Sequence, residues 1–121
     1  MMLYRQKVLL ALVECLEGKV KDRDLQNYLF LFIQKYHQEK LYEFVPYKYG
    51  CFSFQSYADR RNLTKFGHLM ESEDWVLNDT CYMNQLKRAD ALKIEAFNKE
   101  GLIYLSNVLI LPIFEPNRSD Y

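Results

Sequence analysis

The apolar residues of the first forty positions recur at the spacing of two helices. In the first segment, roughly residues 3–17, they fall on one helical face, and Gly18 stands where a helix commonly ends. The second segment, roughly residues 22–39, carries a wide apolar stripe and begins with acidic residues that suit a helix N-terminus. Phe30 and Leu31 lie off that stripe, so we expect this helix to be central, with neighbours on both sides.

An aromatic, extended stretch then leads into a third helix. Pro46 forbids a helix interior and Gly50 marks a turn, with a short strand expected over residues 42–45. Ser53 is a suitable N-cap for a helix over roughly residues 54–66. Its expected core residues are Phe54, Ala58, Leu63 and Phe66. Its expected exposed residues are Gln55, Asp59, Arg60, Asn62 and Lys65.

After Gly67 the pattern changes from helical to strand-like spacing. Residues 68–77 predict two short strands around an acidic turn. A second N-cap motif, residues 78–80, predicts a fourth helix over about residues 81–99 that packs across the outside. Three helices followed by a hairpin predict a mainly α (α+β) fold of winged helix-turn-helix type, with a three-helix core, a short β-hairpin wing and an additional C-terminal helix.

The chain ends in a strongly apolar stretch, residues 102–114, which predicts a strand-like tail or a hairpin. We therefore divide the chain into a winged-helix-like domain, residues 1–100, and a tail, residues 101–121. Such an apolar segment would promote aggregation if it were exposed. We therefore expect that it either folds on the core or pairs with another chain, and a homodimer is expected. Its expected contact residues are Leu105, Val108 and Ile110.

Composition narrows the classes of function. The 121 residues carry 16 basic and 16 acidic side chains, so the overall basic charge typical of many nucleic-acid-binding proteins is absent. The charge is nevertheless polarised along the chain. Four bases against one acid give residues 44–68 a balance of +3, and four acids give residues 69–79 a balance of −4. A basic segment therefore runs directly into an acidic one.

The cysteines and histidines form no pattern typical of a disulfide framework or a metal site. Cys15, Cys51 and Cys81 are far apart and odd in number. Cys51 has a basic neighbour in sequence but no nearby histidine to act as a base, and His68 follows a helix end, where a capping or surface role is expected. With no phosphate-binding glycine loop either, we expect no enzyme and no cofactor.

Targeting signals are equally weak. The N-terminal apolar run is short, Glu14 interrupts it, and no cleavage site of small residues follows. No apolar stretch reaches the roughly 20 residues that cross a bilayer. A cytoplasmic location without membrane contact is therefore expected.

Three motifs occur in an order that resembles known bacterial domains. They are LQNYLFLF at residues 25–32, FVPYKYGCFSF at residues 44–54 and LTKFG at residues 63–67. This order resembles the N-terminal winged-helix-like domain of an uncharacterised bacterial family of unknown function, numbered four-eight-eight. The aromatic turn that enters a helix is also similar to Panacea antitoxin-associated domains. The resemblance covers about residues 3–100, implies a winged-helix fold, and implies no catalytic residue.

The basic third helix favours a DNA-binding regulatory module. In a winged-helix domain this helix usually enters the major groove of double-stranded DNA, where Arg reads guanine, Gln and Asn read adenine, and Lys contacts phosphate. The candidate DNA contacts are Arg60, Arg61, Lys65, Gln55, Asn62 and Lys48. The acidic turn at residues 71–74 would repel a duplex unless it pointed away. A solvated helix face with ordinary salt bridges remains a second interpretation of these residues.

The alternative function is a protein-interaction module, antitoxin-like or an adaptor, without nucleic-acid contact. Six aromatic residues cluster in residues 42–54, where they either form a contact surface or, as we favour for most of them, anchor the loop to the core. Tyr47 and Tyr49 are the candidate partner contacts in this loop. The neutral charge and the acidic turn favour this alternative.

Overall fold

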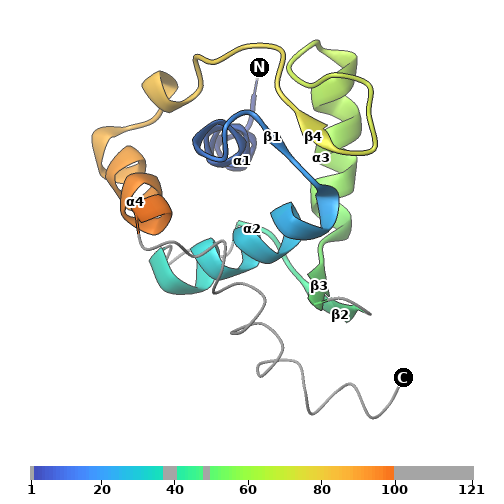
Figure 1. Ribbon diagram of the computed structural model, residues 1–121, viewed down its shortest axis with the longest axis horizontal. Coiled ribbons are helices and arrows are strands. Elements are labelled where there is room, and N and C mark those ends of the chain that lie inside the picture. Colours follow the sequence, from blue (N-terminus) through green and yellow to red (C-terminus); the bar gives the residue numbers. More distant parts are fainter. Residues whose placement is uncertain (1, 37–40, 48–49, 100–121) are drawn as a thin grey trace.

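The computed structural model describes residues 2–36, 41–47 and 50–99, except for the side chains of Tyr47 and Gly50. Within these residues the protein is mainly helical, with two small antiparallel sheets. In Figure 1, α1 is viewed nearly along its axis at the centre, α2 crosses below it, and α3 and α4 lie on opposite sides of it. The predicted mainly α class with a small β component is confirmed.

Helices α1 (Tyr4–Cys15) and α2 (Asp22–Tyr36) form the centre of the core. Residues 8–13 of α1 and residues 25–33 of α2 are all buried, without an exposed side. A helix that is buried all round must have neighbours all round. The prediction that the second helix is central, with Phe30 and Leu31 also packed, is therefore confirmed.

A two-residue strand, β1 (Lys19–Val20), stands between α1 and α2 and pairs antiparallel with β4 (Trp75–Val76). Gly18, at a φ of +77°, adopts the left-handed conformation that follows a helix end and turns the chain into β1. Beyond β4, Leu77 forms a single antiparallel bridge with Leu69. The hairpin predicted after the third helix is thus one short strand and one bridge, and its main strand partner, β1, was not predicted.

The aromatic segment between α2 and α3 forms a second antiparallel pair, β2 (Val45–Tyr47) and β3 (Gly50–Phe52). The strand expected to begin at Tyr42 instead begins at Val45, because Tyr42 turns into the core and is buried. Phe44 packs edge-to-face on Phe30, with 5.4 Å between the ring centroids. The anchoring role predicted for most of these aromatic residues is therefore confirmed for Tyr42 and Phe44.

The last helix, α4 (Arg88–Lys99), begins well after its predicted start, and a 3-10 turn, η1 (Met83–Gln85), precedes it. The cause lies in α1. The Glu14 carboxylate accepts hydrogen bonds from the backbone N–H groups of Tyr82 and Met83, at 3.0 and 3.1 Å. Tyr82 is also buried, so these contacts hold the chain against α1. Helix α4 therefore begins only at Arg88.

Helix α4 covers one side of α1 and α2 through only two buried residues, Ile94 and Phe97. The Phe97 ring meets Phe32 edge-to-face, with 5.5 Å between the centroids. The remaining residues of α4 are exposed or half-buried, so this helix lies across the outside, as its partly apolar pattern predicted.

Candidate interaction surface on helix α3

Helix α3 (Phe54–Lys65) presents one narrow side to the core and most of its length to solvent. Its buried residues are Ser56, Asp59 and Leu63. The line farthest from them, at helical spacing, consists of Phe54, Ala58, Arg61 and Lys65. A few side chains therefore fix the helix, and the outer line is available for contact.

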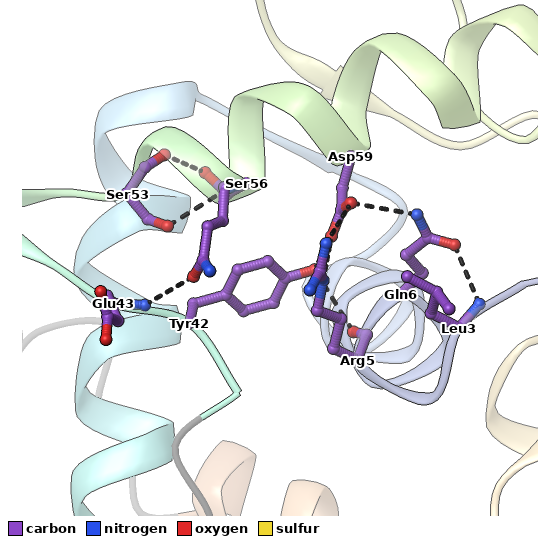
Figure 2. Close-up of polar contacts among 9 residues, drawn as sticks. Leu3, Arg5, Gln6, Tyr42, Glu43, Ser53, Ser56 and Asp59 are labelled. Atoms are coloured by element: carbon purple, nitrogen blue, oxygen red, sulfur yellow. Dashed lines mark hydrogen bonds and ion pairs between the residues drawn. The ribbon is translucent and has the colours of Figure 1, made fainter.

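Asp59 is the central anchor of α3, and at 2% exposure it contradicts the expectation of an exposed carboxylate. Arg5 donates to its two oxygens at 2.8 and 3.1 Å, Gln6 donates at 3.0 Å, and the Tyr42 hydroxyl donates at 2.6 Å (Figure 2). Burial alone would raise the pKa of Asp59, but the hydrogen bonds from Arg5, Tyr42 and Gln6 outweigh it and hold the pKa below its ordinary value. The network joins α3 to α1.

The N-terminus of α3 is fixed by α2. The Gln26 amide accepts a hydrogen bond from the Ser53 N–H at 2.9 Å and donates to the Ser56 hydroxyl at 2.8 Å. The Ser53 hydroxyl accepts from the Ser56 N–H at 3.3 Å, which confirms Ser53 as the N-cap. The neighbouring Cys51 thiol donates to the Gln26 carbonyl at 3.4 Å, and burial raises its pKa to about 12, so the thiol stays protonated near neutral pH.

Arg60 is engaged by the acidic turn that follows α3. Its guanidinium donates to the backbone carbonyl oxygens of Ser72 and Asp74, the latter at 3.1 Å. The same group lies 5.4 Å from the centroid of the Trp75 ring, within cation–π range. These contacts hold the acidic turn beside α3, so the turn does not point away from the helix. Arg60 would have to leave them to contact DNA.

Trp75 is fixed in turn by Asp22, the first residue of α2. The two Asp22 carboxylate oxygens accept hydrogen bonds from the Trp75 indole N–H at 2.7 Å and from the Tyr57 hydroxyl at 2.6 Å. One carboxylate therefore joins α2, α3 and β4. From the sequence, the acidic residues at the start of this helix are expected only to suit a helix N-terminus, because Tyr57 and Trp75 lie far away along the chain.

Arg61 and Lys65 line a groove between α3 and the acidic turn, with a volume of about 360 Å³. Glu71 and Ser72 form the opposite wall. Among the residues that the structure describes, neither Arg61 nor Lys65 has a hydrogen-bond or ion-pair partner. The groove thus has cations on the helix wall and a carboxylate on the turn wall.

Gln55 and Asn62, the other candidates for base contact on α3, lie off this groove. The side-chain amide oxygen of Gln55 accepts a hydrogen bond from the Glu43 backbone N–H at 2.9 Å. Asn62 lines a second groove of about 400 Å³ on another side of α3, together with Leu3 and Phe66. Of the predicted DNA contacts on α3, the three cations Arg60, Arg61 and Lys65 thus line one groove, whereas Gln55 and Asn62 lie elsewhere.

Phe54 and Phe66 are 71% and 72% exposed, which contradicts their prediction as core residues. The hydrogen bonds of Ser56 and Asp59 determine which side of α3 is buried. Both phenylalanine rings therefore point outward. The Phe54 ring meets the Phe52 ring edge-to-face, with 4.9 Å between the centroids. Large exposed aromatic residues are typical of surfaces that bind a partner.

The remaining predicted contact residues cannot be placed on this surface. Tyr47 belongs to β2, but its side chain is not described. The residues outside the described ranges are Lys48, Tyr49, Leu105, Val108 and Ile110.

The surroundings of His68 are aromatic. His68 Nδ1 lies 2.9 Å from the Tyr82 hydroxyl, so the half-buried ring packs on the segment before η1. In the described ranges, no group of three or more His, Cys, Asp or Glu residues is placed to hold a metal ion. Nor does any described helix combine the length and apolar character needed to cross a membrane.

Comparisons with known proteins supply no function. Family models, curated proteins and solved structures all give no match to this chain. The resemblance described above stays a prediction.

Proposed function

We propose that this protein is a non-catalytic interaction module of winged-helix type that binds another protein through α3. The order of elements supports the fold: α1, β1, α2, the β2–β3 pair, α3, the bridge residue Leu69, an acidic turn and β4. Here β4 lies between β1 and Leu69, as the last strand of a winged helix lies between the strand after the first helix and the first strand of the wing.

The observation that carries the proposal is the exposure of Phe54 and Phe66 at the two ends of α3. Aromatic residues anchor protein interfaces because they bury a large apolar area with few rotatable bonds. A helix that reads DNA needs polar and cationic side chains along its outer face. The outer line of α3 mixes both kinds, because Phe54 lies on it with Arg61 and Lys65, whereas Phe66 lies on another side of the helix beside Asn62. Protein partners accept such mixtures.

The acidic turn argues against duplex DNA. Arg60 holds this turn beside α3, and the exposed Glu71 lines the groove that contains Arg61 and Lys65. A duplex on those cations would therefore bring its phosphates toward this carboxylate. Phosphate charge dominates DNA affinity, so carboxylates at this place repel the duplex.

DNA binding is the second candidate, because Arg61 and Lys65 are cations one helical turn apart that have no ion-pair partner in the described part of the chain. With these residues on the outer line of α3, a duplex would meet them first. Such binding would weaken steeply as salt rises, whereas an interface built on Phe54 and Phe66 would not.

The test compares the two candidates on one set of variants. Phe54→Ser/Phe66→Ser removes the aromatic anchors, and Arg61→Glu/Lys65→Glu removes the cations. Leu92→Ser is the matched control, since Leu92 is 49% exposed on α4, on the opposite side of α1 from α3 (Figure 1). Each chain is tested for capture of a protein partner, a second copy included, and for retardation of mixed-sequence duplex DNA at low salt.

We expect partner capture that the phenylalanine double variant loses and Leu92→Ser keeps, with no DNA retardation. Retardation that falls with salt and disappears in Arg61→Glu/Lys65→Glu would reverse the order of the two candidates. Capture that survives the loss of both phenylalanines would contradict the proposed binding face.

A further inference from the structure

The two long walls of the groove between α3 and the acidic turn carry opposite charges. Arg61 and Lys65 stand on the helix wall. Glu71 stands on the turn wall, and Glu73 is exposed in the same turn. None of these four side chains has an ion-pair partner within the described part of the chain.

Both walls are held in place by other residues. Asp59 fixes α3 through Arg5 and Tyr42. Arg60 fixes the turn through the carbonyl oxygens of Ser72 and Asp74. The unpaired charges are therefore carried on a prepared surface, and a ligand for it needs carboxylates opposite the helix and cations opposite the turn.

The groove itself has that arrangement of charges. A two-fold axis that lies in the contact plane and runs along the groove places the helix wall of one copy against the turn wall of another. Arg61 and Lys65 then face Glu71 of the second copy, with Glu73 in the same turn, and the same contact occurs twice. We propose that this groove is a self-complementary interface that binds a second copy of this chain.

Apolar area adjoins the charged strip. Tyr57 lines this groove and also the neighbouring groove that contains Phe54, so the exposed ring of Phe54 lies next to the contact. Ion pairs on a surface contribute little affinity but fix register, while buried aromatic area supplies affinity. Because this inference uses the same face of α3, it rests on the proposed function.

The experiment is a charge exchange on the full chain. Variant A carries Arg61→Glu/Lys65→Glu, so both walls are acidic. Variant B carries Glu71→Lys/Glu73→Lys, so both walls are basic. Each is measured alone and in an equal mixture by analytical ultracentrifugation, at low salt and at about 1 M salt, where the Debye length is only about 3 Å.

The unaltered chain is expected to dimerise, more weakly at high salt. Variants A and B should each dissociate at least about tenfold more readily than the unaltered chain, because like charges then face each other. Their mixture should form a one-to-one heterodimer, since both of its contacts pair acid with base. Recovery on mixing also shows that each variant is folded.

Two results would overturn the inference. A dimer that neither variant weakens must form elsewhere, for example through residues 102–114. A chain that stays monomeric but captures another protein through Phe54 refutes the dimer and leaves the proposed function intact. Salt-dependent DNA retardation that requires Arg61 and Lys65 would instead count against the proposed function itself.

Discussion

The hydroxyl of Tyr42 donates a 2.6 Å hydrogen bond to Asp59, and both side chains are almost completely removed from solvent. Tyr42 comes from the segment before β2, and Asp59 comes from the middle of α3. Arg5 of α1 completes the site on the same carboxylate at 2.8 Å. Three segments distant in sequence are thus joined at one buried charge, which makes the surface of α3 depend on the core beneath it.

Replacing this hydroxyl should destabilise the protein. In Tyr42→Phe the ring stays buried, but Asp59, which is 2% exposed, loses a short hydrogen bond. We expect a loss of about 1.5–3 kcal/mol in the free energy of unfolding, the range for hydrogen bonds to charged groups. Urea denaturation followed by circular dichroism measures it.

Tyr36→Phe is the matched comparison, and its effect should have the opposite sign. The Tyr36 hydroxyl is buried and finds no hydrogen-bond partner among the described residues. Removing an unsatisfied buried hydroxyl relieves a desolvation cost, so we expect a gain of up to about 1 kcal/mol. Equal losses in the two variants would mean that the Tyr42 contact has no special energetic role.

Asp59 should make the protein sensitive to acid. Its pKa is lower in the folded than in the unfolded chain, so its contribution is complete above the unfolded pKa. That contribution is lost as the pH falls from about 4 through the folded pKa. We expect Asp59→Asn to lose about 2 kcal/mol at neutral pH and to show a shallower decline of stability below about pH 4.

Chemical denaturation over this pH range tests the prediction, with Glu95→Gln as control. Glu95 is an exposed carboxylate on α4, and its replacement should leave the wild-type pH profile unchanged. If Asp59→Asn and wild type decline in parallel below pH 4, the folded pKa of Asp59 is not depressed.

Arg60→Lys should loosen the acidic turn while leaving α3 in place. A lysine cannot reach both carbonyl oxygens and cover the Trp75 ring with a flat group. We expect faster hydrogen exchange at residues 71–74 and a loss of about 1–2 kcal/mol, read from the fluorescence of Trp75, the only tryptophan. Arg61→Lys, at an exposed position, should change stability by less than about 0.5 kcal/mol. Identical effects of the two substitutions would contradict the role of Arg60.

Cys51 should resist thiol reagents in the folded protein. Burial raises its pKa to about 12, so its thiolate is about a thousandfold scarcer near pH 8 than that of an ordinary cysteine. A Cys15→Ser/Cys81→Ser variant isolates this thiol for labelling with Ellman's reagent. We expect slow labelling that becomes rapid in denaturant, and rapid labelling of the folded chain would show that the site is open.

The local patterns of the sequence predicted the first three helices well. Spaced apolar residues located α1 and α2, and Ser53 located the start of α3 because an N-cap acts on its own helix. Gly18 was equally informative, since a left-handed residue at a helix end is a local requirement.

The failed predictions concern residues whose partners are distant in the sequence. From its sequence context Asp59 is expected on the surface, but in the fold Arg5 pairs with it and it is buried. Because Asp59 occupies the buried side of α3, Phe54 and Phe66 are exposed. The start of α4 could not be predicted because Glu14, in α1, competes for the backbone amides of Tyr82 and Met83. No short window of sequence contains both partners of such contacts.

The pairing of β1 with β4 has a consequence for how the protein is made. Val20 pairs with Trp75, so this contact closes a loop that contains α2 and α3. During synthesis, α1 and α2 leave the ribosome long before Trp75 does, and their apolar surfaces stay incompletely covered until it emerges. A nascent chain arrested before β4 emerges should therefore be sensitive to protease, and one arrested after α4 emerges should not.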